Sequence, residues 1–170
     1  MKIHNIHERS MTCTSTVVSE LLDGLSKPND RLWPGDRWPA MKLDSSLRVG
    51  SAGGHGPVRY RVSEYVPGLK VAFRFDDSGL VAGLDGRHWF EVIPNGEQTV
   101  LRHVIEAKCD LRTWLFWIAV VAPLHDALLE DALDRAERAV NPSSRASSGW
   151  SVWVRFIRFL IPHGGGETAR

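Results

Sequence analysis

The sequence predicts an α+β fold in which a curved antiparallel sheet wraps around a long carboxy-terminal helix. From about residue 45 to 108, apolar and polar residues alternate with the period of strands. From Asp110 to about Val140, the apolar residues recur with the period of a helix. A flat sheet with helices on one face would bury the same residues. It would not explain why so many large aromatic side chains share the inward face, so we favour the curved sheet.

The first 44 residues are predicted to contain a strand, a helix and an irregular apolar segment. Residues 2 to 10 form the strand, and hydroxyls at residues 14 to 16 precede a helical apolar stripe that ends near Gly24. Residues 29 to 44 contain two prolines and a glycine, which oppose a long regular element. They also contain several large apolar side chains. We expect this segment to be an apolar loop or short helix that covers the core.

A turn at Pro67-Gly68 sets the register of the first predicted hairpin. A type II turn places glycine at the position that needs a positive φ. The resulting register pairs Val62 with Phe73 and Tyr60 with Phe75, all on the inward face.

A second hairpin is predicted at Asn95-Gly96, the strongest short-range signal for a two-residue turn. With these two residues as the turn, Phe90 lies opposite Leu101 and His88 lies opposite His103. Because side chains alternate along a strand, both histidines fall on the apolar face.

The glycine-rich segment 50–57 is predicted to be a flexible connection. It lacks the lysine of a phosphate-binding loop and the strand-to-helix context of a dinucleotide site, so nucleotide binding is not expected. Farther along, Pro123 is expected to kink the long helix or to begin its second part. There His125 shares a face with Leu129, one turn later.

Composition excludes several classes of protein. A chain of 170 residues suits one domain, and a net charge of +1 from 21 basic and 20 acidic residues gives no reason to expect nucleic acid as a partner. Cys13 and Cys109 are interpreted as reduced thiols of a cytoplasmic protein, although a bridge between them stays open. The amino terminus has no apolar signal sequence. The longest apolar run, Trp114 to Leu124, is shorter than the roughly 20 residues of a membrane span, so none is expected.

Several segments resemble bacterial members of the START-like, or SRPBCC, superfamily, which includes polyketide cyclases and dehydrases, lipid-transfer domains and plant hormone-binding proteins. The segments are Leu32-Trp33-Pro34, Arg37-Trp38-Pro39, Gly53 to Pro57, Gly86 to Val92 and Pro123 to Asp131. They are most similar to an actinobacterial branch, and no catalytic motif of the aromatase or hormone-receptor branches can be matched. The resemblance covers about residues 1 to 140. It implies a helix-grip fold with an elongated, mostly apolar cavity between sheet and helix.

The expected ligand site lies on the wall of that cavity. Its predicted residues are Trp33, Trp38, Met41, Tyr60, Val62, Phe73, Phe75, His88, Phe90, Leu101, His103, Ile105, Trp117, His125 and Leu129. Aromatic residues at these spacings are also ordinary core residues, so only an unfilled volume would distinguish a site from a core.

His88, His103 and His125 are the candidate catalytic residues, although no catalytic role can be assigned from the sequence. Imidazoles titrate near neutrality, so they suit acid and base roles. Two buried histidines can equally stay neutral and hydrogen-bond to each other, with no chemistry. A zinc site would need a cross-strand pair and a distant helix to supply the ligands, so we expect no metal and no cofactor.

The tail is predicted to be a separate element. The expected segments are a Ser/Pro/Gly linker at 141–149, an amphipathic basic and aromatic helix at 150–162 and a flexible tail at 163–170. Segment 150–161 has three possible roles: packing on the domain or on a second copy as a homodimer, lying in a membrane interface, or covering the cavity mouth.

From the sequence we expect a protein that is either free in the cytoplasm or peripheral to a membrane on its cytoplasmic side, and that binds a small hydrophobic molecule as a carrier or sensor. A lipid, a polyketide or an aromatic metabolite would fit. The alternative is a cofactor-independent cyclase, dehydrase or isomerase that uses the cavity histidines as acid and base.

Overall fold

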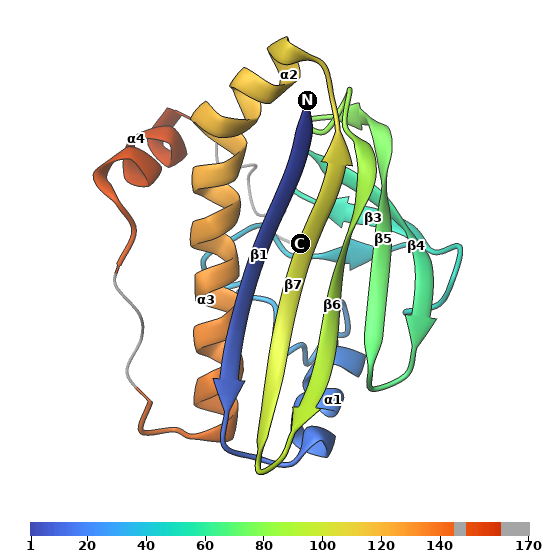
Figure 1. Cartoon of the computed structure of the whole chain (residues 1–170), viewed down its shortest axis with the longest axis vertical. Helices are drawn as coiled ribbons and strands as arrows, with labels where there is room; N and C mark the ends of the chain where they lie inside the picture. The colour runs from blue at the N-terminus through green and yellow to red at the C-terminus, as the bar shows by residue number, and fades with distance from the viewer. Residues whose placement is uncertain (145–148, 161–170) are drawn as a thin grey trace, which may run out of the picture.

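Seven antiparallel strands form one curved sheet that wraps around a long helix, α3, in the computed structural model, which describes residues 1–144 and 149–160 (Figure 1). This confirms the predicted α+β helix-grip fold. The elements are β1 (Lys2–Met11), α1 (Ser15–Asp23), β2 (Lys42–Leu43), β3 (Ala52–His55), β4 (Val58–Val66), β5 (Lys70–Gly79), β6 (Asp85–Asn95), β7 (Gln98–Lys108), α2 (Leu111–Phe116), the π-helical segment η1 (Trp117–Val121), α3 (Ala122–Val140) and α4 (Val152–Leu160).

The strand order is β1-β7-β6-β5-β4-β3-β2, so β2 to β7 form a meander, and β1 pairs with β7 at the edge opposite β2. Strand β1 pairs with β7 along its whole length, from Lys2 opposite Lys108 to Met11 opposite Thr99. Helix α1 and the segment that follows it then cross to the other edge of the sheet, where β2 pairs with β3. The edge strand β1 packs against α3, and β2 forms the other edge of the sheet.

The β6–β7 hairpin differs from the predicted register by two residues. Asn95 pairs with Gln98, so Gly96 and Glu97 form the turn, and His103 lies opposite Phe90. Gly96 has φ +62° and Asn95 has a negative φ, whereas a turn on Asn95-Gly96 would require a positive φ at both. A shift of two preserves the alternation of side chains, so His88 and His103 still share the concave face.

The β4–β5 hairpin confirms the predicted pairs of Val62 with Phe73 and Tyr60 with Phe75. Its turn is longer than predicted, because Val66 pairs with Lys70 and three residues form the loop. Gly68 takes the expected positive φ of +72°. A register shift between Val62 and Glu64 offsets the extra loop residue and restores the predicted pairing.

The glycine-rich segment is a strand rather than a flexible connection. Gly53 and Gly54 belong to β3, which joins β2 to β4. A Cβ on Gly53 would lie 2.0 Å from the carbonyl oxygen of Lys42, and one on Gly54 would lie 1.9 Å from that of Val58. Glycine is required here because neighbouring backbones approach too closely for any side chain.

The predicted break at Pro123 appears as a π-helical segment directly before α3. Pro123 lies in the first turn of α3, where a missing N–H costs least. In a regular helix the carbonyl of Ala119 would accept a hydrogen bond from residue 123, which has no N–H. The indole Nε1 of Trp153 in α4 donates to this carbonyl at 2.9 Å. The proline thus leaves an acceptor to which α4 binds.

Helix α3 is held against β1 by a row of ionic contacts. The guanidinium of Arg9 contacts Glu130, Asp134 and Glu137, which project from successive turns of α3. On a neighbouring face, Leu129, Leu133 and Ala136 are buried in the main core, together with residues of α1. Charged and apolar faces therefore fix the rotation of α3 about its axis.

Helix α4 packs on the outside of α3, on the side away from β1 in Figure 1. It begins at Val152 rather than Trp150, and of its apolar side chains only Val154 and Ile157 are fully buried. Trp153 is 49% exposed and Leu160 is 61% exposed, so the domain covers only part of the apolar side of α4. Residue 161 and the predicted tail at 163–170 lie outside the described residues, as do residues 145–148 of the predicted linker.

The helical run Leu111–Val140 is long and apolar enough to cross a membrane, judged by length and composition alone. The prediction of no such segment, which considered only Trp114 to Leu124, was too restrictive. Mostly buried core helices pass the same test, but only 17% of the most apolar 18-residue window of this run is buried.

Candidate functional site

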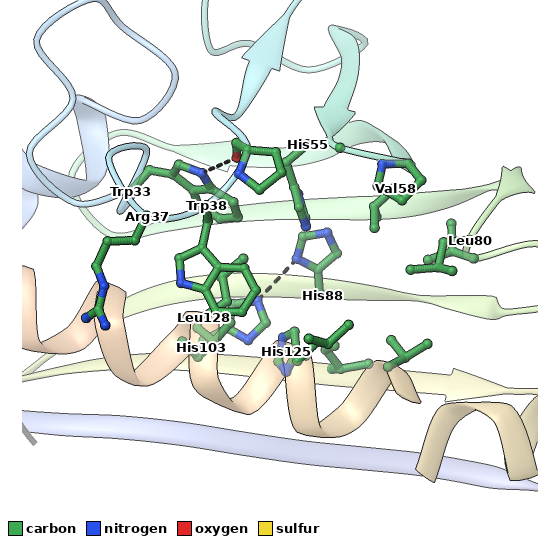
Figure 2. A pocket seen from close by; sticks show the side chains of 18 of the residues that line it. Trp33, Arg37, Trp38, His55, Val58, Leu80, His88, His103, His125 and Leu128 are labelled. Atoms are coloured by element: carbon green, nitrogen blue, oxygen red, sulfur yellow. Dashed lines mark hydrogen bonds between the residues drawn. The ribbon is translucent and has the colours of Figure 1, made fainter. Parts of the chain in front are cut away.

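A cavity of about 790 Å³ lies between the concave face of the sheet and α3 (Figure 2). One wall comes from β5, β6 and β7, and the facing wall comes from η1 and α3. The segment 33–39, the turn 55–58 and Arg158 of α4 complete the enclosure. An unfilled volume is the observation that separates a ligand site from an ordinary aromatic core.

Most of the predicted site residues line this cavity. They are Trp33, Trp38, Phe75, His88, Phe90, His103, Ile105, Trp117, His125 and Leu129. The other predicted residues do not line it and instead fill the core: Met41, Tyr60, Val62, Phe73 and Leu101. They were assigned by strand alternation and burial, which cannot tell a side chain that borders a void from one packed on all sides.

The sequence analysis missed several cavity residues, chiefly His55, Arg37 and Arg158. His55 lies at the end of β3, in the segment taken for a flexible connection. Its Nδ1 lies 3.1 Å from the hydroxyl of Tyr60, and its ring contacts that of Trp33 at a centroid distance of 4.7 Å. Leu80, Val81, Leu124 and Leu128 were also missed. Leu128 could have been predicted, because it lies three residues after His125 and therefore on the same face of the helix.

Four histidines gather on the cavity wall, from three strands and one helix (Figure 2). His88 Nδ1 and His103 Nε2 lie 3.2 Å apart, as a hydrogen bond requires. The ring of His125 lies 5.1 Å from that of His103. His88 stacks against Phe73 and Phe75, with both centroid distances at 5.0 Å. The pair is therefore fixed by aromatic packing on one side and by the helix on the other.

The outer nitrogens of the pair, His88 Nε2 and His103 Nδ1, are buried and have no hydrogen-bond partner among the described residues. Each neutral imidazole carries one N–H and one lone pair. If His88 donates to His103, the pair presents an acceptor on His88 and a donor on His103, and the other tautomers reverse these roles. In either case the pair offers one donor and one acceptor. An unmet buried polar atom costs about 1–3 kcal/mol, so a ligand that pairs with these atoms gains that energy back.

Burial keeps the cavity histidines neutral at physiological pH. It lowers the pKa of His88 and of His103 well below 6.5, and repulsion between neighbouring histidines when they are protonated acts in the same direction. Burial, together with His125 and Arg59, lowers the pKa of His55 to about 3. The pKa of His125 is also lowered by burial, although Asp126 opposes the shift. The four histidines therefore offer hydrogen-bonding groups without charge.

The segment 30–39 covers one side of the cavity and is held by specific hydrogen bonds. The carboxylate of Asp30 accepts from the backbone N–H groups of Leu32 and Trp33, both at 2.8 Å. The indole Nε1 of Trp33 donates to the carbonyl of Pro39 at 2.9 Å, as Figure 2 shows. These bonds fold the proline-containing segment into a cover that the sequence predicted only in outline.

Asp131 of α3 connects this cover to α4. Its Oδ2 accepts from the indole Nε1 of Trp38 at 2.7 Å and from that of Trp150 at 2.9 Å, and Arg37 pairs with its other oxygen. The guanidinium carbon of Arg158 lies 4.2 Å from the ring centroid of Trp38 and 4.1 Å from that of Trp150. These cation-π contacts place Arg158 at the cavity.

One group of described residues has the composition and spacing of a metal site: His7, His125 and Asp126, whose ligand atoms all lie within 4.8 Å of one another. It is not the set of His88, His103 and His125 considered from the sequence. His7 places Nε2 at 3.0 Å from Asp126 and Nδ1 at 2.9 Å from Glu130. Burial acts to lower the pKa of His7, but these hydrogen bonds outweigh it and raise the pKa. A protonated His7 between two carboxylates accounts for the cluster, so we assign no metal to it.

No protein-family model matches the chain, and no curated protein sequence matches it. Solved structures do match. Norcoclaurine synthase from Thalictrum flavum, a point mutant in complex with a transition-state analogue, gives a TM-score of 0.64 at 14% identity over 85% of this chain and 98% of that chain. CalU16 from Micromonospora echinospora gives 0.54 at 16% identity over 92% and 82%. A solution structure from Thermobifida fusca gives 0.59 at 15% identity over 80% and 94%. These are Bet v1/SRPBCC-type folds, and at such identities the likeness shows the fold alone.

Proposed function

We propose that this protein binds a small, mostly apolar molecule with one polar group in the cavity between sheet and α3, as a carrier or sensor. The observation that supports the proposal is the unfilled volume of about 790 Å³, whose lining includes His88 and His103, each with an unpartnered ring nitrogen. Cavities that bind small molecules measure about 300–1,000 Å³ and combine an apolar lining with a few polar groups. Lipids, polyketides and aromatic metabolites have this character. We also propose that the chain belongs to an actinobacterial branch of the START-like superfamily.

Apolar burial supplies the affinity and the histidine pair supplies the selectivity. A ligand that loses about 300 Å² of apolar surface gains about 7.5 kcal/mol at 25 cal/mol per Å², before the costs of association are subtracted. Because the pair offers one donor and one acceptor without charge, it suits a hydroxyl or a neutral carbonyl better than a carboxylate or an amine.

The first experiment is native mass spectrometry of the protein purified from its own host, to look for a retained small molecule. The second compares naphthalene with 2-naphthol as probes, by titration of the full chain. The variant His88→Phe keeps an aromatic ring between Phe73 and Phe75 and removes both nitrogens. We expect it to bind 2-naphthol about five- to tenfold more weakly, the equivalent of about 1–1.4 kcal/mol, and naphthalene equally well. Equal losses for both probes, or no binding of either by the native chain, would contradict the proposal.

The second candidate function is a cofactor-independent cyclase, dehydrase or isomerase. The 3.2 Å contact between His88 and His103 supports it, since one imidazole can remove a proton while the other polarises an oxygen. Against it stands the lowered pKa of both, because a general base works best when its pKa lies near the working pH. We therefore prefer binding. Once a ligand is known, glutamine at each position separates the two: lost turnover with retained binding supports the enzyme, and weaker binding with no turnover supports the carrier.

A further inference from the structure

Helix α4 exposes an apolar face to solvent along its whole length. Val154 and Ile157 of α4 are buried against the domain. The other apolar residues of α4 are exposed: Val152 83%, Trp153 49%, Phe156 50%, Phe159 83% and Leu160 61%. The rings of Trp153 and Phe156 stack on each other at 5.7 Å and do not turn inward. Burial within the domain does not account for this face.

A second exposed apolar group lies on the helical segment that α4 touches. Its members, on α2 and η1, are Leu111 60%, Leu115 51%, Phe116 41% and Ile118 45% exposed. The hydrogen bond from Trp153 to the carbonyl of Ala119 joins the two elements directly beside Ile118. In the most apolar 18-residue window of Leu111–Val140, only 17% is buried. We call these exposed residues of α2, η1 and α4 the apolar docking surface. Patches this rich in large apolar side chains mark interaction sites.

The charges on these elements have one sign. Between residues 111 and 125 and between 149 and 160, the charged side chains are Arg112, Arg155 and Arg158, with no aspartate or glutamate. Arg112 and Arg155 are exposed. Helices that lie in the interface of an anionic membrane combine tryptophan, phenylalanine and leucine with arginine. Each basic residue near the surface contributes about 1 kcal/mol to the free energy of membrane binding. A second copy of the chain would instead bring arginines toward arginines.

We propose that the apolar docking surface binds an anionic lipid bilayer, with α4 and the α2–η1 segment lying in the headgroup region. The second half of α3 stays outside the bilayer, because Asp131 and Asp134 are engaged with Arg37 and Arg9 inside the domain. Trp117, Val121 and Leu124, from the same helical run, line the cavity, as does Arg158 of α4. Docking therefore brings the cavity next to the lipid surface. The proposal stands without a cavity ligand, since its surface residues are distinct from the histidine wall.

The test is co-sedimentation of the full chain with phosphatidylcholine vesicles, and with vesicles that also contain phosphatidylglycerol. The double variant Phe156→Ser with Phe159→Ser alters only exposed side chains, so it retains the fold. Leu69→Ser, at a leucine of the β4–β5 loop that is 49% exposed, much like Phe156, is the control. We expect the double variant to partition at least tenfold less and the control to match the native chain. Arg155→Gln should lower binding about fivefold to the anionic vesicles and little to the neutral ones.

Equal partitioning of the native chain and the double variant would overturn the proposal, as would native protein that stays in the supernatant with both vesicle types. Sedimentation velocity supplies the remaining outcome. A native dimer that the double variant converts to monomer, with no vesicle binding, would assign this surface to a second copy of the chain and overturn the lipid proposal.

Discussion

Acidification from neutral pH is expected to destabilise this protein through its buried histidines before its carboxylates are protonated. The folded-state pKa of His55 is about 3, against an ordinary value of 6.5. Below pH 6.5 the unfolded chain therefore takes up a proton that the folded chain refuses. The stability that neutral His55 allows is fully present above pH 6.5 and is lost as the pH falls toward 3.

The magnitude follows from the interval between the two pKa values. A pH of about 5 lies about 1.5 units below the pKa of an unfolded histidine, so the unfolded chain is protonated at this position while folded His55 stays neutral. At about 1.36 kcal/mol per unit, His55 alone lowers the unfolding free energy by about 2 kcal/mol. His88 and His103, with pKa values well below 6.5, act in the same direction. Their combined effect is large against a total stability of about 5–15 kcal/mol.

The assay is urea denaturation of the native chain and His55→Gln at several pH values up to about pH 9, with the acid arm taken as the interval between about pH 7 and 5. Glutamine does not titrate, so the variant should lose about 2 kcal/mol less over this interval, whatever its stability at neutral pH. His7→Gln is the control with the opposite sign. The raised pKa of His7 gives stability that is fully present below pH 6.5 and is lost as the pH rises through the folded pKa. It should change the alkaline arm only. Parallel acid arms for native protein and His55→Gln would refute the reasoning.

Three further changes test the fold and the tail contact. Gly53→Ala should cost about 1–3 kcal/mol, because the new Cβ would lie 2.0 Å from the carbonyl oxygen of Lys42; thermal unfolding measures it, and an unchanged midpoint would contradict the assigned pairing of β2 with β3. Leu133→Ala, at a fully buried site of α3, should cost about 2–5 kcal/mol in urea denaturation, and a loss below about 1 kcal/mol would show that this side of α3 is not packed. Asp131→Asn should weaken the attachment of α4 by about 2 kcal/mol. The amides of Val152–Leu160 should then exchange hydrogen faster, while exchange in β6 and β7 stays unchanged. If α4 exchanges at the same rate in both proteins, Asp131 does not hold α4 on the domain.

Alternation of side chains along the strands was sufficient to place His88 and His103 on the concave face. This prediction was correct although the β6–β7 turn was predicted at the wrong residues. Placing the turn at Asn95-Gly96 shifted the predicted cross-strand partners by two residues. Because side chains on a strand alternate with a period of two, the residues assigned to each face of the sheet did not change. The glycine-rich segment shows the opposite case. Its glycines are typical of flexible chain, and only the approach of the Lys42 and Val58 carbonyls shows that a strand requires them.

The tail shows the same division. Helical periodicity identified an apolar helix near residues 150–161, but it left open whether this helix packs on the domain or a second copy, lies in a membrane interface or covers the cavity mouth. The structure buries Val154 and Ile157 and leaves Trp153 half exposed, because an acceptor freed by Pro123 lies within reach of the indole. That acceptor belongs to a residue 34 positions away in the chain. No local pattern records such a contact.

Local periodicity and turn residues by themselves determined the α+β class, the order of strands and helices, and the face on which the histidines lie. These features depend on interactions between residues near one another in the chain. The tertiary structure decided the rest: which aromatic residues border an unfilled volume and which fill the core, that His55 joins the histidine wall, and that Asp131 gathers the cover and α4 at one carboxylate. A cavity is the space left after distant segments have packed, and its shape depends on their mutual placement. The sequence specifies that placement only through the complete fold.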